Sequence, residues 1–114
     1  MLSFQFDQEE QKLVCIFCEK MNSENSPLVT QKIETKLHEL EQNSMISTGD
    51  SGKYDRLKII FDLEEVNFVA SAFMRTCIIF ARKIQPGNFS IINSQPVIKK
   101  TFMIAGLDNL IEIS

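Results

Sequence analysis

The stretch LKIIFDL, residues 57–63, leads through a short polar segment into SAFMR, residues 71–75, and the apolar pattern changes there from that of a strand to that of a helix. Ser71 stands at the start of the predicted helix. A serine at a helix N-cap accepts a hydrogen bond from the free N–H groups of the first turn. The same end of a helix favours negative charge. Ser71 therefore fits two roles, a plain N-cap or a phosphoacceptor.

Periodicity predicts alternating strands and helices on both sides of this unit. The predicted strands cover residues 3–7, 11–18, 57–63, 89–93 and 110–113. The predicted helices run from residue 26 to about 42 or 45, from 71 to about 84, and from 96 to 106. Pro27 and Pro96 stand at first helical positions, where the missing N–H of proline costs nothing. A polar, glycine-containing loop is predicted at residues 47–53.

The element order ββαβαβαβ implies an α/β fold with a small mixed sheet. Strands separated by helices pair in parallel through right-handed crossovers, whereas the first two strands are joined too tightly for a crossover and must be antiparallel. The length of 114 residues predicts one domain over residues 1–114. In open sheets of this kind partners meet the carboxyl ends of the strands, where Ser71 is expected.

Composition excludes several classes of protein. A hydrophobic content of 44 % and a charged content of 24 % are ordinary for a globular chain, and a net charge of −3 gives no reason to expect a nucleic-acid partner. The basic pairs at residues 82–83 and 99–100 are interpreted as solvated helix faces. No apolar run is long enough to span a membrane, and the acidic N-terminal segment does not resemble a signal peptide. We expect a cytoplasmic protein without a membrane partner.

The residues that could support metal or enzyme chemistry are few. Cys15 and Cys18 form a C-x-x-C on a predicted strand, where an offset of three places them on opposite faces. Cys77 and His38 are the remaining ligand types, which leaves no closed metal site. The sole histidine lies on the first helix, away from Ser71, so a serine hydrolase would lack its base. We expect reduced cysteines, no metal, no cofactor and no enzymatic activity.

The order and spacing of these motifs resemble the STAS domain, a family that includes the bacterial anti-anti-sigma factors, also called anti-sigma factor antagonists. The motifs are the opening strand pair, the helix after Ser26, the strand that ends in Asp, the Ser-Ala-x-x-Arg helix start, and Ala-Gly-Leu at residues 105–107. The resemblance implies a mostly parallel sheet with an antiparallel first strand. It also implies partner switching, in which the protein binds an anti-sigma factor that is an ATPase-type serine kinase and is released when that kinase phosphorylates it.

The resemblance also assigns roles to individual residues. Ser71 stands at the phosphoacceptor position. The implied partner-binding residues are Asn22, Asp62, Ala70, Ala72, Phe73, Met74 and Arg75. Asn22 and Asp62 are placed at the same end of the domain as Ser71, with Asp62 at the close of the central strand. Asn22, Ala70 and Phe73 replace, respectively, an acidic residue, an Asp or Ser, and a glycine of the usual pattern.

Phe73 has two interpretations from the sequence. An aromatic side chain at an exposed helix start could anchor an interface. Phe73 also belongs to a stripe with Cys77, Phe80 and Ile84 at helical spacing, which is typical of core residues.

Other hypotheses for function stay open at this point. One is a non-switching interaction or scaffold module in which Ser71 is only a cap. Another is a subunit that handles a small ligand or lipid, since domains of this family occur beside transporters.

Overall fold

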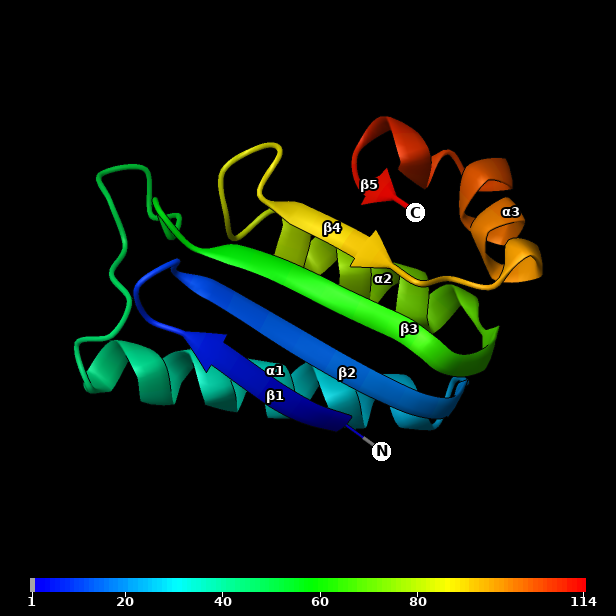
Figure 1. Ribbon diagram of the computed structural model, residues 1–114, viewed down its shortest axis with the longest axis horizontal. Coiled ribbons are helices and arrows are strands. Elements are labelled where there is room, and N and C mark those ends of the chain that lie inside the picture. Colours follow the sequence, from blue (N-terminus) through cyan, green and yellow to red (C-terminus); the bar gives the residue numbers. More distant parts are fainter. Residues whose placement is uncertain (1) are drawn as a thin grey trace.

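The computed structural model describes residues 2–114 and contains five strands and three α-helices (Figure 1). The strands are β1 (Leu2–Asp7), β2 (Lys12–Met21), β3 (Lys58–Val69), β4 (Phe89–Ile92) and β5 (Glu112–Ile113). The helices are α1 (Asn25–Gln42), α2 (Ser71–Ala81), α3 (Pro96–Ile104) and a short 3-10 helix, η1 (Leu107–Asn109).

The strands form one sheet in the order β1-β2-β3-β4-β5. β1 pairs antiparallel with β2, and each later neighbour pairs in parallel. The parallel strands advance in one direction across the sheet, and right-handed crossovers therefore bring their helices to the same side. Figure 1 shows α1 and α2 together behind the strands. The predicted fold class, a mixed and mostly parallel sheet with helices, is confirmed.

The largest difference from the predicted elements lies at the end of the central strands. β3 continues to Val69, so the polar segment 64–68 is strand and not a connection, and β2 continues to Met21. The β2–β3 register shifts twice in this region, because β3 carries extra residues at β-bulges. Bulges break the two-residue alternation of buried side chains, which explains why the segment does not look like a strand in the sequence.

Smaller differences occur at element ends. α1 begins at Asn25 and α2 ends at Ala81, whereas residues 26 and 84 were predicted. β5 contains only residues 112–113, because η1 and a turn precede it. A 3-10 helix of three residues has no period that could be recognised in the sequence.

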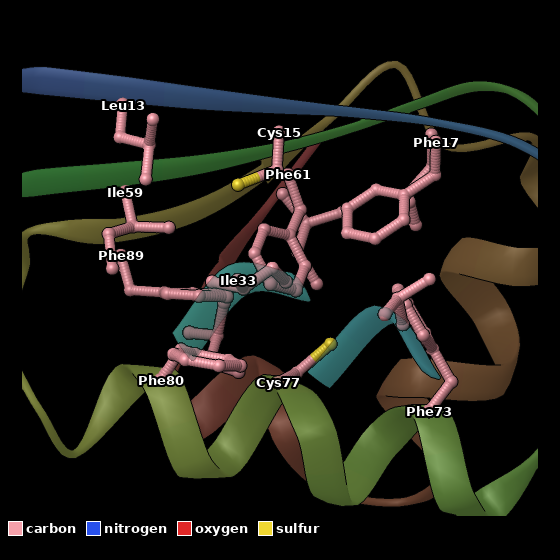
Figure 2. Close-up of a cluster of buried hydrophobic side chains, with 14 of the residues drawn as sticks. Leu13, Cys15, Phe17, Ile33, Ile59, Phe61, Phe73, Cys77, Phe80 and Phe89 are labelled. Carbon is pink, nitrogen blue, oxygen red and sulfur yellow. The ribbon is translucent and has the colours of Figure 1, made fainter. Parts of the chain in front are cut away.

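The core is packed between the sheet and the helices, and phenylalanine rings dominate its centre (Figure 2). Phe61 on β3 contacts Phe17 on β2 and Phe89 on β4, each at a centroid distance of 4.8 Å in an edge-to-face arrangement. Phe73 and Phe80 reach the ring of Phe61 from α2. Aromatic pairs of this geometry stabilise a core beyond the area that they bury. They fix α2, and therefore Ser71, against the sheet.

The cysteines occupy the positions that the strand pattern predicts. Cys15 is buried beneath the helices with Cys77 of α2, and Cys18 is half-buried on the opposite side of the sheet. Burial raises the pKa of the thiols of Cys15 and Cys77 well above the usual range. All three cysteines are free thiols.

Candidate functional site

Ser71 is the first residue of α2, and its side chain is exposed. The N-cap is Ala70, whose backbone is extended, with φ −100° and ψ 168°. The backbone N–H of Ala70 donates to the carbonyl oxygen of Met21 at 2.9 Å, which keeps Ala70 in strand conformation until the helix starts at the next residue. The prediction that Ser71 is itself the N-cap is therefore wrong by one position.

The first turn of α2 is open to an anion. The carbonyl oxygen of Ala70 accepts hydrogen bonds from the N–H groups of Phe73 and Met74, at 3.0 and 3.3 Å. Within residues 2–114 the N–H groups of Ser71 and Ala72 and the Ser71 hydroxyl make no hydrogen bond, and the first turn contains no acidic residue. Free N–H groups and the positive end of the helix dipole both favour negative charge here.

Asn22 lies beside this turn, because it follows Met21 in the loop between β2 and α1. Its side-chain oxygen accepts hydrogen bonds from the N–H groups of Glu24 and Asn25, at 3.0 and 2.8 Å. Its carbonyl oxygen accepts a further bond from the Ser26 hydroxyl at 2.7 Å. Asn22 therefore holds the start of α1, which begins before the predicted first helical position at Pro27. The acidic residue of the usual STAS pattern could accept the same hydrogen bonds. Asparagine at this position therefore lacks the negative charge but keeps the cap.

Asp62 does not lie at the close of the central strand, and that prediction is wrong. It faces Ile16 and Ile92 on the neighbouring strands, and Val69, the last residue of β3, lies seven residues further along the strand. Seven residues correspond to about 20 Å of strand. One oxygen of Asp62 accepts hydrogen bonds from the Asn93 side chain at 3.2 Å and from the Glu64 N–H at 3.1 Å. The structure does not bring Asp62 to Ser71.

Phe73 is fully buried, which confirms the core interpretation and overturns the alternative of an interface anchor. Its ring lies 5.3 Å from that of Phe17 and 6.0 Å from that of Phe61 (Figure 2). A glycine at this position would leave that space unfilled. Of its predicted neighbours in the site, Met74 packs partly against the core, whereas Ala72 and Arg75 reach the surface.

A groove of about 670 Å³ runs between α1 and α2 from the turn that contains Ala72. Its lining side chains come from one face of each helix: Ser26, Pro27, Thr30, Gln31, Glu34, Thr35, His38, Ala72, Arg75, Thr76 and Ile79. The hydroxyls of Thr30 and Thr76 form a hydrogen bond of 2.7 Å that joins the two helices. Sequence reasoning missed this pair, although a threonine within the apolar stripe of α2 is a signal for it.

Phe68 is a further residue that sequence reasoning missed. It lies near the end of β3 and is 48 % exposed, whereas most phenylalanine side chains in proteins are buried. Phe68 lines a shallow hollow with Lys20, Asn22 and Asn67. Ser71 therefore lies between this hollow and the groove, since Asn22 lines the first and Ala72 the second.

Two further observations concern metal binding and membrane-spanning helices. Within residues 2–114 no three His, Cys, Asp or Glu side chains lie close enough together to hold a metal ion. None of the helices in that range is long and apolar enough to cross a membrane.

The architecture is the STAS fold of SpoIIAA-type anti-sigma factor antagonists, as comparison with solved structures establishes. An anti-sigma factor antagonist from Mycobacterium paratuberculosis has a TM-score of 0.69 and 13 % identity, covering 99 % of this chain and 85 % of its own. Unphosphorylated SpoIIAA has a TM-score of 0.63 and 14 % identity, covering 100 % and 87 %.

Phosphorylated SpoIIAA, a Bacillus cell fate determinant, has a TM-score of 0.62 and 15 % identity, covering 100 % of this chain and 91 % of its own. No protein-family model matches the sequence, and no curated protein is significantly similar to it. The likeness therefore lies in the fold. The predicted resemblance to STAS domains is confirmed at that level.

Proposed function

We propose that this protein is an anti-sigma factor antagonist that binds an anti-sigma factor with serine kinase activity and is released when Ser71 is phosphorylated. The observation that carries the proposal is the exposed, unbonded Ser71 hydroxyl at the first position of α2. The similarity of fold to SpoIIAA, a protein with solved phosphorylated and unphosphorylated forms, supports it. In this proposal the protein is a cytoplasmic bacterial regulator and acts by binding rather than by catalysis.

The local chemistry supports a phosphate at Ser71. Phosphorylation adds a charge of about −1.5 to −2. The phosphate would lie next to the free N–H groups of the first turn, where the helix dipole favours it. The fold would therefore tolerate the modification, and the effect would fall on the partner, which would meet new charge and bulk at the contact surface.

The proposed contact surface surrounds Ser71. Arg75 and Ala72 lie on the groove side and Phe68 with Asn22 on the other side, and Phe68 would act as an aromatic anchor. Phe73 supports this surface from beneath and does not touch the partner. Asp62 is too far along β3 to join the same contact.

A binding role also agrees with the position of His38. It is exposed and lies twelve residues after Ser26 on α1, which corresponds to about 18 Å along the helix. Ser26 and Ala72 line the same end of the groove, so His38 stands well away from the α2 start. His38 is therefore not placed to act as a general base for the Ser71 hydroxyl.

The test is capture of partners from a native cell extract by the wild type and by Ser71→Ala and Ser71→Asp. We expect the wild type and Ser71→Ala to retain an ATPase-type kinase, identified by mass spectrometry, and Ser71→Asp to lose it. Ser51→Asp is the matched control, since Ser51 is an exposed serine in the loop after α1. Phosphate should be found on Ser71 when the captured kinase is supplied with ATP.

Equal capture of the kinase by all the variants would contradict the proposal. Ser71 would then be an exposed helix residue of a constitutive binding module. Ala70 is compatible with that second function, because it offers no side-chain acceptor next to the phosphoacceptor position.

A further inference from the structure

The side of the sheet opposite α1 and α2 has no cover within residues 2–114 (Figure 1). We define the open sheet face by Val14, Ile16, Cys18, Ile60, Asp62 and Ile92. These side chains alternate along the strands with the buried core residues and are half-buried themselves. The aliphatic members are not among the side chains that pack against the core. The face is therefore an apolar surface on a sheet that is otherwise covered by helices.

This surface is acidic toward the carboxyl ends of the strands. Asp62 lies between Ile16 and Ile92 in the strand register, and the exposed Glu64 and Glu65 follow it on β3. Only one oxygen of Asp62 accepts hydrogen bonds, and no lysine or arginine within residues 2–114 forms a salt bridge with it. A half-buried carboxylate among aliphatic side chains is matched best by a cation on an apolar stem.

The outward surface of α3 combines exposed apolar side chains with positive charge, which complements the apolar and acidic open sheet face. We define it by Val97, Lys99, Lys100, Met103 and Ile104. Ile104 and Val97 are 77 % and 64 % exposed and are the most exposed of the large apolar side chains within residues 2–114. Lys100 lies three residues after Val97 and four before Ile104, so the three share one stripe of the helix. Neither Lys99 nor Lys100 has a salt-bridge partner in that range.

A single copy of the chain cannot join these two surfaces. Ile98 and Phe102, on the other side of α3, are buried in the core beneath the sheet, so the outward surface of α3 points away from its own sheet. A helix of nine residues is about 13 Å long, which equals the strand length between Ile60 and Glu64. The outward surface of α3 therefore matches the open sheet face of another copy in both length and charge.

We propose that the protein self-associates head to tail, with the outward surface of α3 of one copy bound to the open sheet face of the next. Lys100 would pair with Asp62, and Val97 and Ile104 would cover Ile16, Ile60 and Ile92. Such a contact uses two different surfaces and leaves one of each free at the ends of every assembly. The proposal is independent of the function assigned to Ser71, because neither surface includes Ser71.

The test is the weight-average mass by light scattering between about 10 μM and about 1 mM protein. We expect the mass of the wild type to rise with concentration beyond twice that of the monomer. Asp62→Lys and the double variant Val97→Ser/Ile104→Ser should each remain monomeric. Leu28→Asp on α1 is the matched control, since Leu28 is 51 % exposed and lies outside both surfaces, and it should associate like the wild type.

Mixing the two defective variants gives the sharpest result. Asp62→Lys keeps an intact α3 surface and the double serine variant keeps an intact sheet face, so an equimolar mixture should form a one-to-one dimer that grows no further. Circular dichroism confirms that each variant is folded, and Glu64→Lys replaces Asp62→Lys if the latter unfolds.

Several outcomes would overturn the proposal. They are a constant monomer mass for the wild type, association of either defective variant alone, and a mixture that stays monomeric while the wild type associates. Binding of the monomeric wild type to anionic lipid vesicles, lost in the double serine variant, would assign the α3 surface to a membrane instead.

Discussion

The backbone N–H of Ala70 donates a 2.9 Å hydrogen bond to the carbonyl oxygen of Met21, and this bond brings the starts of α1 and α2 together. Asn22 follows Met21 and holds the first turn of α1, while Ser71 follows Ala70 and begins α2. Asn22 and Ser71, which are far apart in the sequence, thus become neighbours through the hydrogen bond at the end of the β2–β3 pairing. The length of β3 therefore controls the geometry of the candidate site.

Asn22→Ala should destabilise the protein by about 1 kcal/mol, because the N–H groups of Glu24 and Asn25 lose their acceptor. Asn22→Asp should be at least as stable as the wild type, since a carboxylate keeps both hydrogen bonds and adds favourable charge at the helix start. Urea denaturation measures both changes. A destabilised Asn22→Asp variant would show that the cap is not the main role of this side chain.

Ser71→Asp should raise the free energy of unfolding by about 0.3–1 kcal/mol, because the first turn of α2 contains no acidic residue and its N–H groups are free. Ser71→Lys should lower it by a similar amount. Ser51→Asp is the control and should change stability by less than about 0.5 kcal/mol. A loss of stability in Ser71→Asp would mean that the loss of partner capture by this variant cannot be assigned to charge at the interface.

The parts of the fold that the sequence predicts well are those with an unbroken period. Val29, Ile33, Leu37 and Leu40 recur at helical spacing and are all buried on α1. Leu13, Cys15 and Phe17 alternate on β2 and are buried against the helices. In both cases the backbone repeats one geometry, so the spacing of residues along the chain determines which way their side chains point.

The errors arise where that repetition fails. Bulges in β3 hide the strand over residues 64–68, and the misplacement of Asp62 and the omission of Phe68 both follow from the missing strand. The two interpretations of Phe73 could not be separated from the sequence for a different reason. Its spacing fits both a core stripe and an exposed helix start, and the contacts with Phe17 and Phe61 that decide between them come from distant strands.

The two phenylalanines near Ser71 should respond differently to truncation. Phe73→Ala should cost about 3–5 kcal/mol, because a fully buried ring is removed from the aromatic core. Phe68→Ala should cost about 1 kcal/mol, since nearly half of that residue already faces solvent. Partner capture by the folded Phe68→Ala variant should nevertheless fall sharply. If both variants unfold at the same denaturant concentration, the assignment of Phe73 to the core and Phe68 to the surface is wrong.

The three cysteines should differ in reactivity toward a thiol reagent. Cys15 and Cys77 are buried with raised pKa values, so raising the pH from 7 to about 9 should not create a reactive thiolate at either in the folded protein. Cys18 is half-buried on the open sheet face and should be modified first. Mass spectrometry after labelling should find one modification on native protein and three in denaturant.

The two buried thiols should also make stability depend on pH. In the unfolded chain the thiols of Cys15 and Cys77 regain an ordinary pKa and lose their protons as the pH passes it. The unfolded state then binds fewer protons than the native state, so stability should fall above about pH 9 by up to about 1.4 kcal/mol per pH unit for each thiol. Labelling of Cys15 or Cys77 in native protein at the rate of Cys18 would contradict the burial that this fold assigns to them.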